Sequence, residues 1–266
     1  EPALTDFRKA WDLKKTESYA LGVGTLLQEK KPDSAIVFLQ RAIDVIPSSL
    51  MLKLSLARAY DLSGKLAEAL KITDEILAIE PRQVDVLKFR ADLLQRQNRS
   101  VEAIATLERA YQYAPFDVEL NYELAHQYAE ARNPKVLRLA DSLIRQDTDS
   151  MNLHAEPAYF KGLYYANIKD QENAIKMFDE AILRNYYYHN AYIEKGRVLL
   201  DQKRLEEALR TFNLALTLSP KFADAYYWIG RCQEIQGKKE EAKLNYQRAF
   251  SLDPEFIIAK EAAEKL

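Results

Sequence analysis

The feature that most constrains the fold of this chain is a sequence repeat of 34 residues. When residues 189–222 are aligned with residues 223–256, small, aromatic and proline residues coincide at five places: Gly196 with Gly230, Ala208 with Ala242, Phe212 with Tyr246, Ala215 with Ala249, and Pro220 with Pro254. A chain that repeats itself at a fixed period of roughly 20–50 residues stacks one structural unit on the next. The period therefore predicts the architecture better than the length does.

The same positions recur towards the N-terminus. A first series of small residues comprises Ala57, Ala91, Ala125, Gly162, Gly196 and Gly230. A second series comprises Ala35, Ala69, Ala103, Val136, Ala174, Ala208 and Ala242, and prolines recur at Pro47, Pro81, Pro115, Pro220 and Pro254. All three series depart from the period only around residues 118–154, where one residue is missing inside the unit and four are added after it.

Each unit is predicted to contain two amphipathic helices that are too short to be stable alone. Alanine or glycine where the two helices cross allows their backbones to approach to roughly 8–10 Å. Proline ends the second helix, because it lacks the amide hydrogen that a continuing helix needs. In the irregular unit we expect the second helix at about residues 135–146, after Asn133 and Pro134.

With this period and these small residues, the chain resembles the tetratricopeptide repeat family. The resemblance implies an all-α fold, a right-handed α–α solenoid (superhelix) of about seven helix pairs. The expected units are 16–49, 50–83, 84–117, 118–154 (irregular), 155–188, 189–222 and 223–256. Residues 1–15 are expected to form an N-terminal capping helix with Thr5 as its N-cap, and residues 257–266 a C-terminal capping helix. The alternative for residues 1–15 is a tether whose Trp11 docks a partner.

Several local expectations follow from residue type. Gly64 and Asn98 lie in turns between helices, where a positive φ is often needed. Asp33 or Ser34 is expected to cap the following helix, and Cys232 to be buried. The connection that contains Asp147, Asp149 and Ser150 has the composition of a calcium loop but lacks its ligand spacing and its glutamate. We therefore expect a solvated loop there, which divides the array into two parts.

Composition and motifs exclude several functions. A net charge of −2 over 266 residues gives no basic surface for nucleic acid. No apolar run approaches the roughly 18 residues of a membrane span, and a single cysteine excludes an internal disulfide. His126, His154 and His189 lack metal-binding spacing, and there is no glycine-rich phosphate loop. We therefore expect no enzyme activity, no cofactor and no metal.

Binding residues are predicted only through the resemblance, which implies that first helices line a concave groove. Transferred to this chain, the groove positions include the following candidates for partner binding: Arg58, Lys88, Tyr122, His126, Tyr159, Asn190, Arg197, Tyr227 and Arg231. Tyrosine and arginine dominate the binding energy of many interfaces. Family members that bind chaperone tails hold a terminal carboxylate with Lys and Asn one turn apart. Here Lys88 is followed by Asp92, so a chaperone tail is not expected.

The favoured hypothesis is a monomeric, non-catalytic scaffold that binds a peptide or a partner protein in this groove. One alternative is a structural component or accessory lipoprotein of a cell-envelope assembly, with an N-terminal signal removed before Glu1. The other is the regulatory arm of a larger enzyme. The first alternative favours the bacterial periplasm or envelope, and a cytoplasmic location remains open.

Overall fold

The computed structural model describes residues 2–146 and 154–266, and in these residues it contains sixteen α-helices and no strand. The all-α class predicted from the period is confirmed. The chain forms two compact units, unit 1 (Glu1–Leu120) and unit 2 (Asn121–Leu266). The division lies inside helix α8 (Val118–Glu130), and not in the connection after residue 146 where the insertion predicts it.

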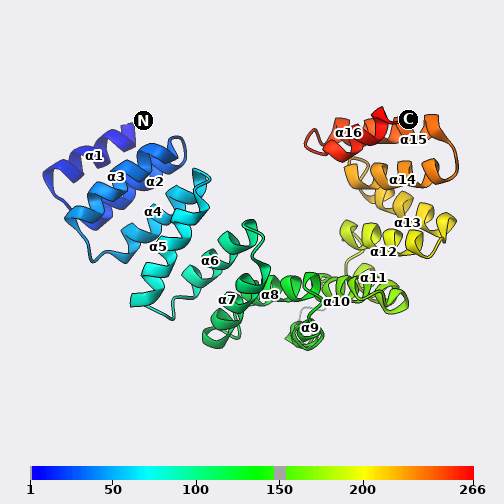
Figure 1. Cartoon of the computed structure of the whole chain (residues 1–266), viewed down its shortest axis with the longest axis horizontal. Coiled ribbons are helices and arrows are strands. Elements are labelled where there is room, and N and C mark those ends of the chain that lie inside the picture. Colours follow the sequence, from blue (N-terminus) through cyan, green and yellow to red (C-terminus); the bar gives the residue numbers. More distant parts are fainter. Residues whose placement is uncertain (1, 147–153) are drawn as a thin grey trace. The chain divides into compact units, whose positions relative to one another are not determined.

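Unit 1 is built from consecutive helices that pack in pairs, α2 with α3, α4 with α5, and α6 with α7, while α1 packs against α2 (Figure 1). Their bounds are α1 Pro2–Leu13, α2 Glu17–Gln28, α3 Pro32–Val45, α4 Leu50–Leu62, α5 Leu66–Ile79, α6 Val84–Arg96 and α7 Ser100–Tyr113. A buried cluster that includes Val23, Leu39 and Leu52 joins the first of these pairs into one core.

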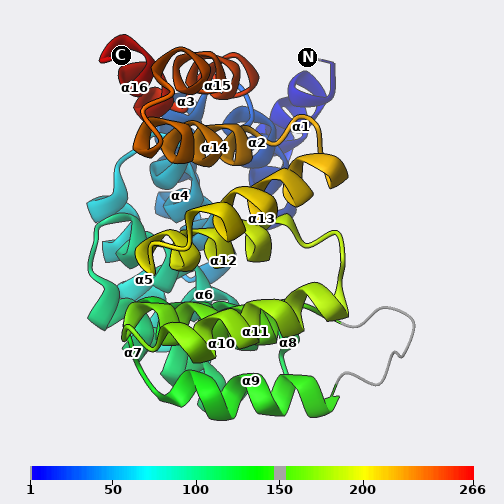
Figure 2. The ribbon, with the colours of Figure 1, turned by 90° about the vertical axis from the view of Figure 1, so that its right-hand side faces the viewer.

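Unit 2 repeats the pairing, α10 with α11, α12 with α13 and α14 with α15, while α9 packs against α10 and the C-terminal helix α16 packs against α15 (Figure 2). The bounds after α8 are α9 Lys135–Gln146, α10 Glu156–Asn167, α11 Gln171–Arg184, α12 His189–Asp201, α13 Leu205–Leu218, α14 Ala223–Ile235, α15 Lys239–Leu252 and α16 Ile257–Glu264. Helix α9 begins and ends where the sequence predicts the second helix of the irregular unit. The first helices α10, α12 and α14 also contact one another in order, so their exposed sides form one continuous surface.

The glycines at the helix crossings lie against large aromatic side chains of the second helix. A Cβ atom added to Gly162 would lie 2.5 Å from Cε1 of Phe178, and one added to Gly230 would lie 2.7 Å from Cε1 of Tyr246. Gly196 is covered in the same way by the ring of Phe212. The glycines therefore make room for an aromatic side chain of the second helix, and at Gly230 the backbone oxygen of Ala242 also lies 3.2 Å from the added Cβ.

The turns between paired helices share one backbone motif. Gly64 and Asn98 have φ values of 73° and 60°, as predicted. Arg132, Lys169, Lys203 and Gly237 adopt the same left-handed conformation, with φ between 55° and 78°. At each of these turns the next amide donates to a carbonyl five residues back, as Lys65 N does to Tyr60 O at 2.8 Å. This Schellman motif satisfies carbonyl groups that the end of the first helix leaves unpaired.

Two predicted helix caps are wrong. Thr5 lies inside α1, which already begins at Pro2. Helix α3 begins at Pro32, and its N-cap is Lys31, with no side-chain hydrogen bond from Asp33 or Ser34 to the helix end. In both places a proline sets the start, because its fixed φ suits the first helical position and its missing amide hydrogen is not needed there.

The alternative of a tether for residues 1–15 is also wrong. Trp11 is only 7% exposed, and its ring packs edge-on against Phe38 of α3, with the ring centroids 5.9 Å apart. The side chain is therefore part of the core of unit 1, where α1 covers the first helix pair. At the other end of the chain, α16 packs against α15 and buries Ala259 and Ala263.

Cys232 is fully buried, as predicted, and this burial raises the pKa of its thiol to about 12. The predicted acidic loop with Asp147, Asp149 and Ser150 lies outside the described residues. Of the helices that the structure describes, none is both long and apolar enough to cross a membrane.

Candidate functional site

The exposed surface of the first helices of unit 2 contains a pocket of about 320 Å³, which we call the unit-2 pocket. It lies along α10, α12 and α14 and includes the end of α8. Its lining consists of Glu130, Tyr159, Leu163, Ala166, Asn167, Lys169, Gln171, Glu194, Arg197, Val198, Leu200, Asp201 and Trp228. Two of the predicted partner-binding residues, Tyr159 and Arg197, therefore lie in one pocket.

Arg197 is held in a fixed orientation between a carboxylate and an aromatic ring. Its Nη1 donates to both carboxylate oxygens of Glu194, at 2.7 and 2.9 Å. The guanidinium carbon lies 5.3 Å from the centroid of the Trp228 ring, within the range of a cation–π contact. Trp228 is in turn stacked on Phe212, with centroids 6.1 Å apart and an interplanar angle of 17°. The guanidinium is thus oriented before any ligand arrives.

Tyr159 lies among other aromatic side chains at the side of the pocket. Its ring centroid is 5.2 Å from that of Tyr188 and 5.8 Å from that of Phe178. Burial raises the pKa of Tyr159 well above its usual value, and the nearby carboxylate of Glu194 raises it further. The hydroxyl therefore stays protonated and can donate a hydrogen bond at any physiological pH.

The charges of the unit-2 pocket nearly balance. Burial raises the pKa of Glu194, although the Arg197 cation partly opposes this effect. Lys169 lies 3.8 Å from Asp201, so that pair is also close to neutral. Glu130 forms no ion pair within residues 2–146 and 154–266. The pocket consequently offers oriented polar groups and aromatic rings rather than a strong field of one sign.

The other predicted residues of unit 2 do not belong to the lining of the pocket. Tyr122 and His126 of α8 contact Phe160, with ring centroids 6.1 and 5.6 Å apart. Tyr227 packs against Trp228, Tyr246 and Phe256, so much of its ring serves internal packing. Asn190 and Arg231 are exposed, and Arg231 lies 3.6 Å from Glu234 on the same helix.

The remaining two predicted residues, Arg58 and Lys88, belong to unit 1. Arg58 is exposed on α4. Lys88 on α6 pairs with Glu119 and lies 3.7 Å from Asp117, and its side chain is only 16% exposed. The cation of Lys88 is therefore already paired with carboxylates of unit 1. The transfer of groove positions from the family did not take this ion pair into account.

Sequence reasoning missed Glu194, Trp228 and Glu130. Glu194 and Trp228 occupy one repeat position, because Phe160, Glu194 and Trp228 follow each other at intervals of 34 residues. This series directly follows the series of Tyr159, Ile193 and Tyr227, which contains two of the predicted binding residues. Ile193 is buried, with 6% exposed, so part of the exposed surface of the first helices comes from the next position along the helix.

Comparison with protein-family models identifies the repeats independently. Models described as tetratricopeptide repeat match residues 26–93, 155–186 and 223–256, and a model described as TPR repeat matches residues 196–233. No curated protein matches the sequence.

Solved structures share the fold at low sequence identity. A tetratricopeptide repeat protein from Parabacteroides merdae is 17% identical, with a TM-score of 0.72 over 99% of this chain and 98% of that one. The C-terminal part of a TPR repeat-containing protein from Cytophaga hutchinsonii is 14% identical, with a TM-score of 0.57 over 90% and 97% of the two chains.

The APC/C hetero-tetramer Cut9–Hcn1 gives a TM-score of 0.54 at 16% identity. The match covers 98% of this chain and 51% of that one. The repeat period, the paired helices and these matches lead to one assignment. The chain belongs to the tetratricopeptide repeat family, whose helical repeats indicate a scaffold for protein–protein interaction.

Proposed function

We propose that the unit-2 pocket binds an extended segment of a partner protein, and that the chain acts as a non-catalytic scaffold. The observation that supports this proposal best is the orientation of Arg197 between Glu194 and Trp228. Holding a side chain in its binding geometry in advance lowers the entropy cost of association.

The geometry of Arg197 favours a neutral acceptor on the ligand. A guanidinium has five N–H donors, and Nη1 directs its hydrogen bonds to Glu194, so Nε and Nη2 remain for a ligand. Since Glu194 already compensates the positive charge, a backbone carbonyl suits these donors better than a second carboxylate. The ion pair with Glu194 therefore leads us to prefer the carbonyl.

Apolar side chains of the same segment would contact the rings of Tyr159 and Trp228 and the edge of Leu163. An extended chain advances about 3.3 Å per residue, and packed helices lie roughly 8–10 Å apart. About every third residue of the segment would therefore meet a new first helix, with Tyr122 and Tyr227 at the two ends of the row.

The experiment starts from a random-peptide display library selected on the whole chain. Peptides that bind are then titrated against the wild type, Arg197→Ala, Arg197→Lys and Arg210→Ala. Arg197→Ala should weaken binding by about 1–3 kcal/mol, the range of interface hot spots. Arg197→Lys should recover only part of this loss, because an ammonium does not reproduce the fixed fork of donors. Arg210, exposed on α13 and absent from the pocket lining, is the matched control.

Folding of each variant is checked by its circular dichroism melting curve. Undiminished affinity of Arg197→Ala for every selected peptide would show that the unit-2 pocket is not the binding site. Loss of binding in Arg210→Ala alone would place the site on the second helices instead.

A further inference from the structure

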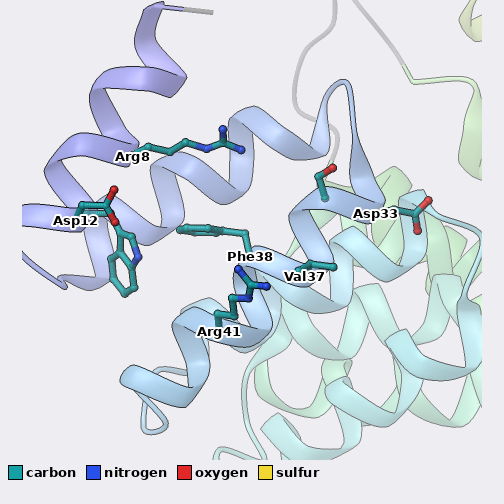
Figure 3. Close-up of a pocket in the computed structure, with 8 residues that line it drawn as sticks. Arg8, Asp12, Asp33, Val37, Phe38 and Arg41 are labelled. Carbon is teal, nitrogen blue, oxygen red and sulfur yellow. The ribbon is translucent and has the colours of Figure 1, made fainter.

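Unit 1 contains a separate pocket of about 650 Å³ between α1 and α3, which we call the α1–α3 pocket. Its lining consists of Arg8, Trp11, Asp12, Asp33, Ser34, Val37, Phe38 and Arg41 (Figure 3). None of these residues belongs to the unit-2 pocket, and the proposal below does not depend on the function proposed for that pocket.

The α1–α3 pocket has an apolar part. Phe38 is partly buried against the edge of Trp11, and Val37 next to it is 50% exposed. An exposed valine beside a partly exposed aromatic ring offers a ligand apolar surface to cover. Figure 3 shows the guanidinium groups of Arg8 and Arg41 in view on either side of the Phe38 ring.

The charges around this apolar part do not balance. Lys15 donates to Asp12 at 3.1 Å, and Lys65 donates to Asp33 at 2.8 Å. Both carboxylates of the pocket are thus paired with lysines that do not line it. Arg8 and Arg41 are exposed, and neither forms an ion pair within the described part of the chain. The pocket therefore retains two uncompensated positive charges beside apolar surface, in a chain whose net charge is −2.

We propose that the α1–α3 pocket binds an acidic segment of a partner protein that carries an apolar side chain next to its carboxylates. The carboxylates would pair with Arg8 and Arg41, since arginine and carboxylate match in geometry and form strong charge-assisted hydrogen bonds. The apolar side chain would cover Val37 and Phe38. Free phosphate or a nucleic-acid backbone would satisfy the arginines but has no group for this apolar surface.

The tryptophans allow a direct measurement. The chain has two, Trp11 in the wall of this pocket and Trp228 in unit 2, so Trp228→Phe leaves Trp11 as the single reporter. The probe is a blocked peptide of alternating glutamate and leucine, and its counterpart carries glutamine in place of glutamate. Trp11 fluorescence is titrated with each peptide in the Trp228→Phe background.

The test variant is Arg8→Gln with Arg41→Gln. Its matched control is Lys9→Gln with Lys71→Gln, which removes two exposed cations of the same unit from outside the pocket. The glutamate peptide should bind the control as it binds the parent protein, and it should bind the test variant at least about tenfold more weakly. The glutamine peptide should bind the parent as weakly as the glutamate peptide binds the test variant.

Equal affinity of the glutamate peptide for the test variant and the control would overturn the proposal. So would equal binding of both peptides to the parent, or tighter binding of a single-stranded oligonucleotide than of the glutamate peptide. Arg197→Ala should leave Trp11 titrations unchanged, so failure here and failure of the unit-2 pocket are separate results.

Discussion

At the scale of single residues, the repeat depends on matched sizes across each helix pair. Gly162, Gly196 and Gly230 face Phe178, Phe212 and Tyr246. Where the first helix carries alanine, at Ala57 and Ala91, the residue sixteen positions later is the smaller Thr73 or Leu107. Because the interior is close-packed, a larger residue on one helix requires a smaller one on the other. This relation can be tested directly.

We predict that Gly196→Ala lowers the free energy of unfolding by about 1–3 kcal/mol, because the new Cβ would overlap the ring of Phe212. Combining it with Phe212→Leu should recover part of the loss, so the two changes should not be additive. Urea unfolding of the wild type, both single variants and the double variant measures the coupling. Additive effects would mean that the ring of Phe212 does not occupy the space beside Gly196.

A second prediction at this scale concerns Glu194. Burial raises its pKa above the ordinary value of 4.5. Between pH 4.5 and the raised pKa, the folded chain keeps a proton that the unfolded chain has released. The stability that this group contributes is therefore fully present below pH 4.5 and is lost as the pH rises through the raised pKa.

The measurement compares the wild type with Glu194→Gln, which has no titrating group at this position. Urea midpoints are recorded from pH 4.5 upwards. The wild type should lose stability relative to the variant as the pH rises, while contributions from all other groups cancel. Parallel curves would show that the carboxyl of Glu194 titrates alike in both states.

At the scale of elements, the turn between paired helices decides how each first helix ends. Within residues 2–146 and 154–266, six turns contain a residue with positive φ: two glycines, and Asn98, Arg132, Lys169 and Lys203. Left-handed backbone costs a residue with a Cβ roughly 1–2 kcal/mol. The Schellman hydrogen bonds and the packing of the following helix offset this cost in the four turns without glycine.

We predict that Gly237→Ala lowers the free energy of unfolding by about 1 kcal/mol, although nothing lies within 4 Å of the added Cβ. The cost would come from the φ of 78° and not from a steric overlap. Lys203→Ala is the matched control, since it places the same residue in the same conformation without adding a Cβ. Thermal melting should find it close to the wild type, and equal losses in both variants would contradict this account.

At the scale of the whole molecule, the repeats divide into two compact units that each contain one tryptophan. Repeats contact mainly their neighbours, so stability is approximately a sum of local terms. A destabilising change in unit 2 should therefore act mostly on unit 2.

We predict that Gly196→Ala shifts the unfolding midpoint reported by Trp228 more than the midpoint reported by Trp11. Single-tryptophan backgrounds, Trp11→Phe and Trp228→Phe, separate the two fluorescence signals in urea titrations. Within each background, the unfolding midpoint of the protein with Gly196→Ala is compared with the midpoint of the protein without it. Equal shifts in the two backgrounds would show that the repeats unfold as one cooperative block.

The sequence by itself determined the parts of this protein that depend on fixed separations along the chain. The period predicted the helix pairs, the bounds of α9, the positive φ of Gly64 and Asn98, and the burial of Cys232. These features arise from contacts inside one repeat or between adjacent repeats. The residues involved therefore stand at constant distances in the sequence.

Only the tertiary structure decided which side chains already have a partner within the protein. Lys88 is paired within unit 1, Arg197 is bound to Glu194 and Trp228, and Trp11 of α1 is buried against Phe38 of α3. The α1–α3 pocket likewise depends on a helix outside the repeat. A long polar side chain can reach several partners from one backbone position. The packing of neighbouring helices therefore selects the partner, and the period carries no information about that choice.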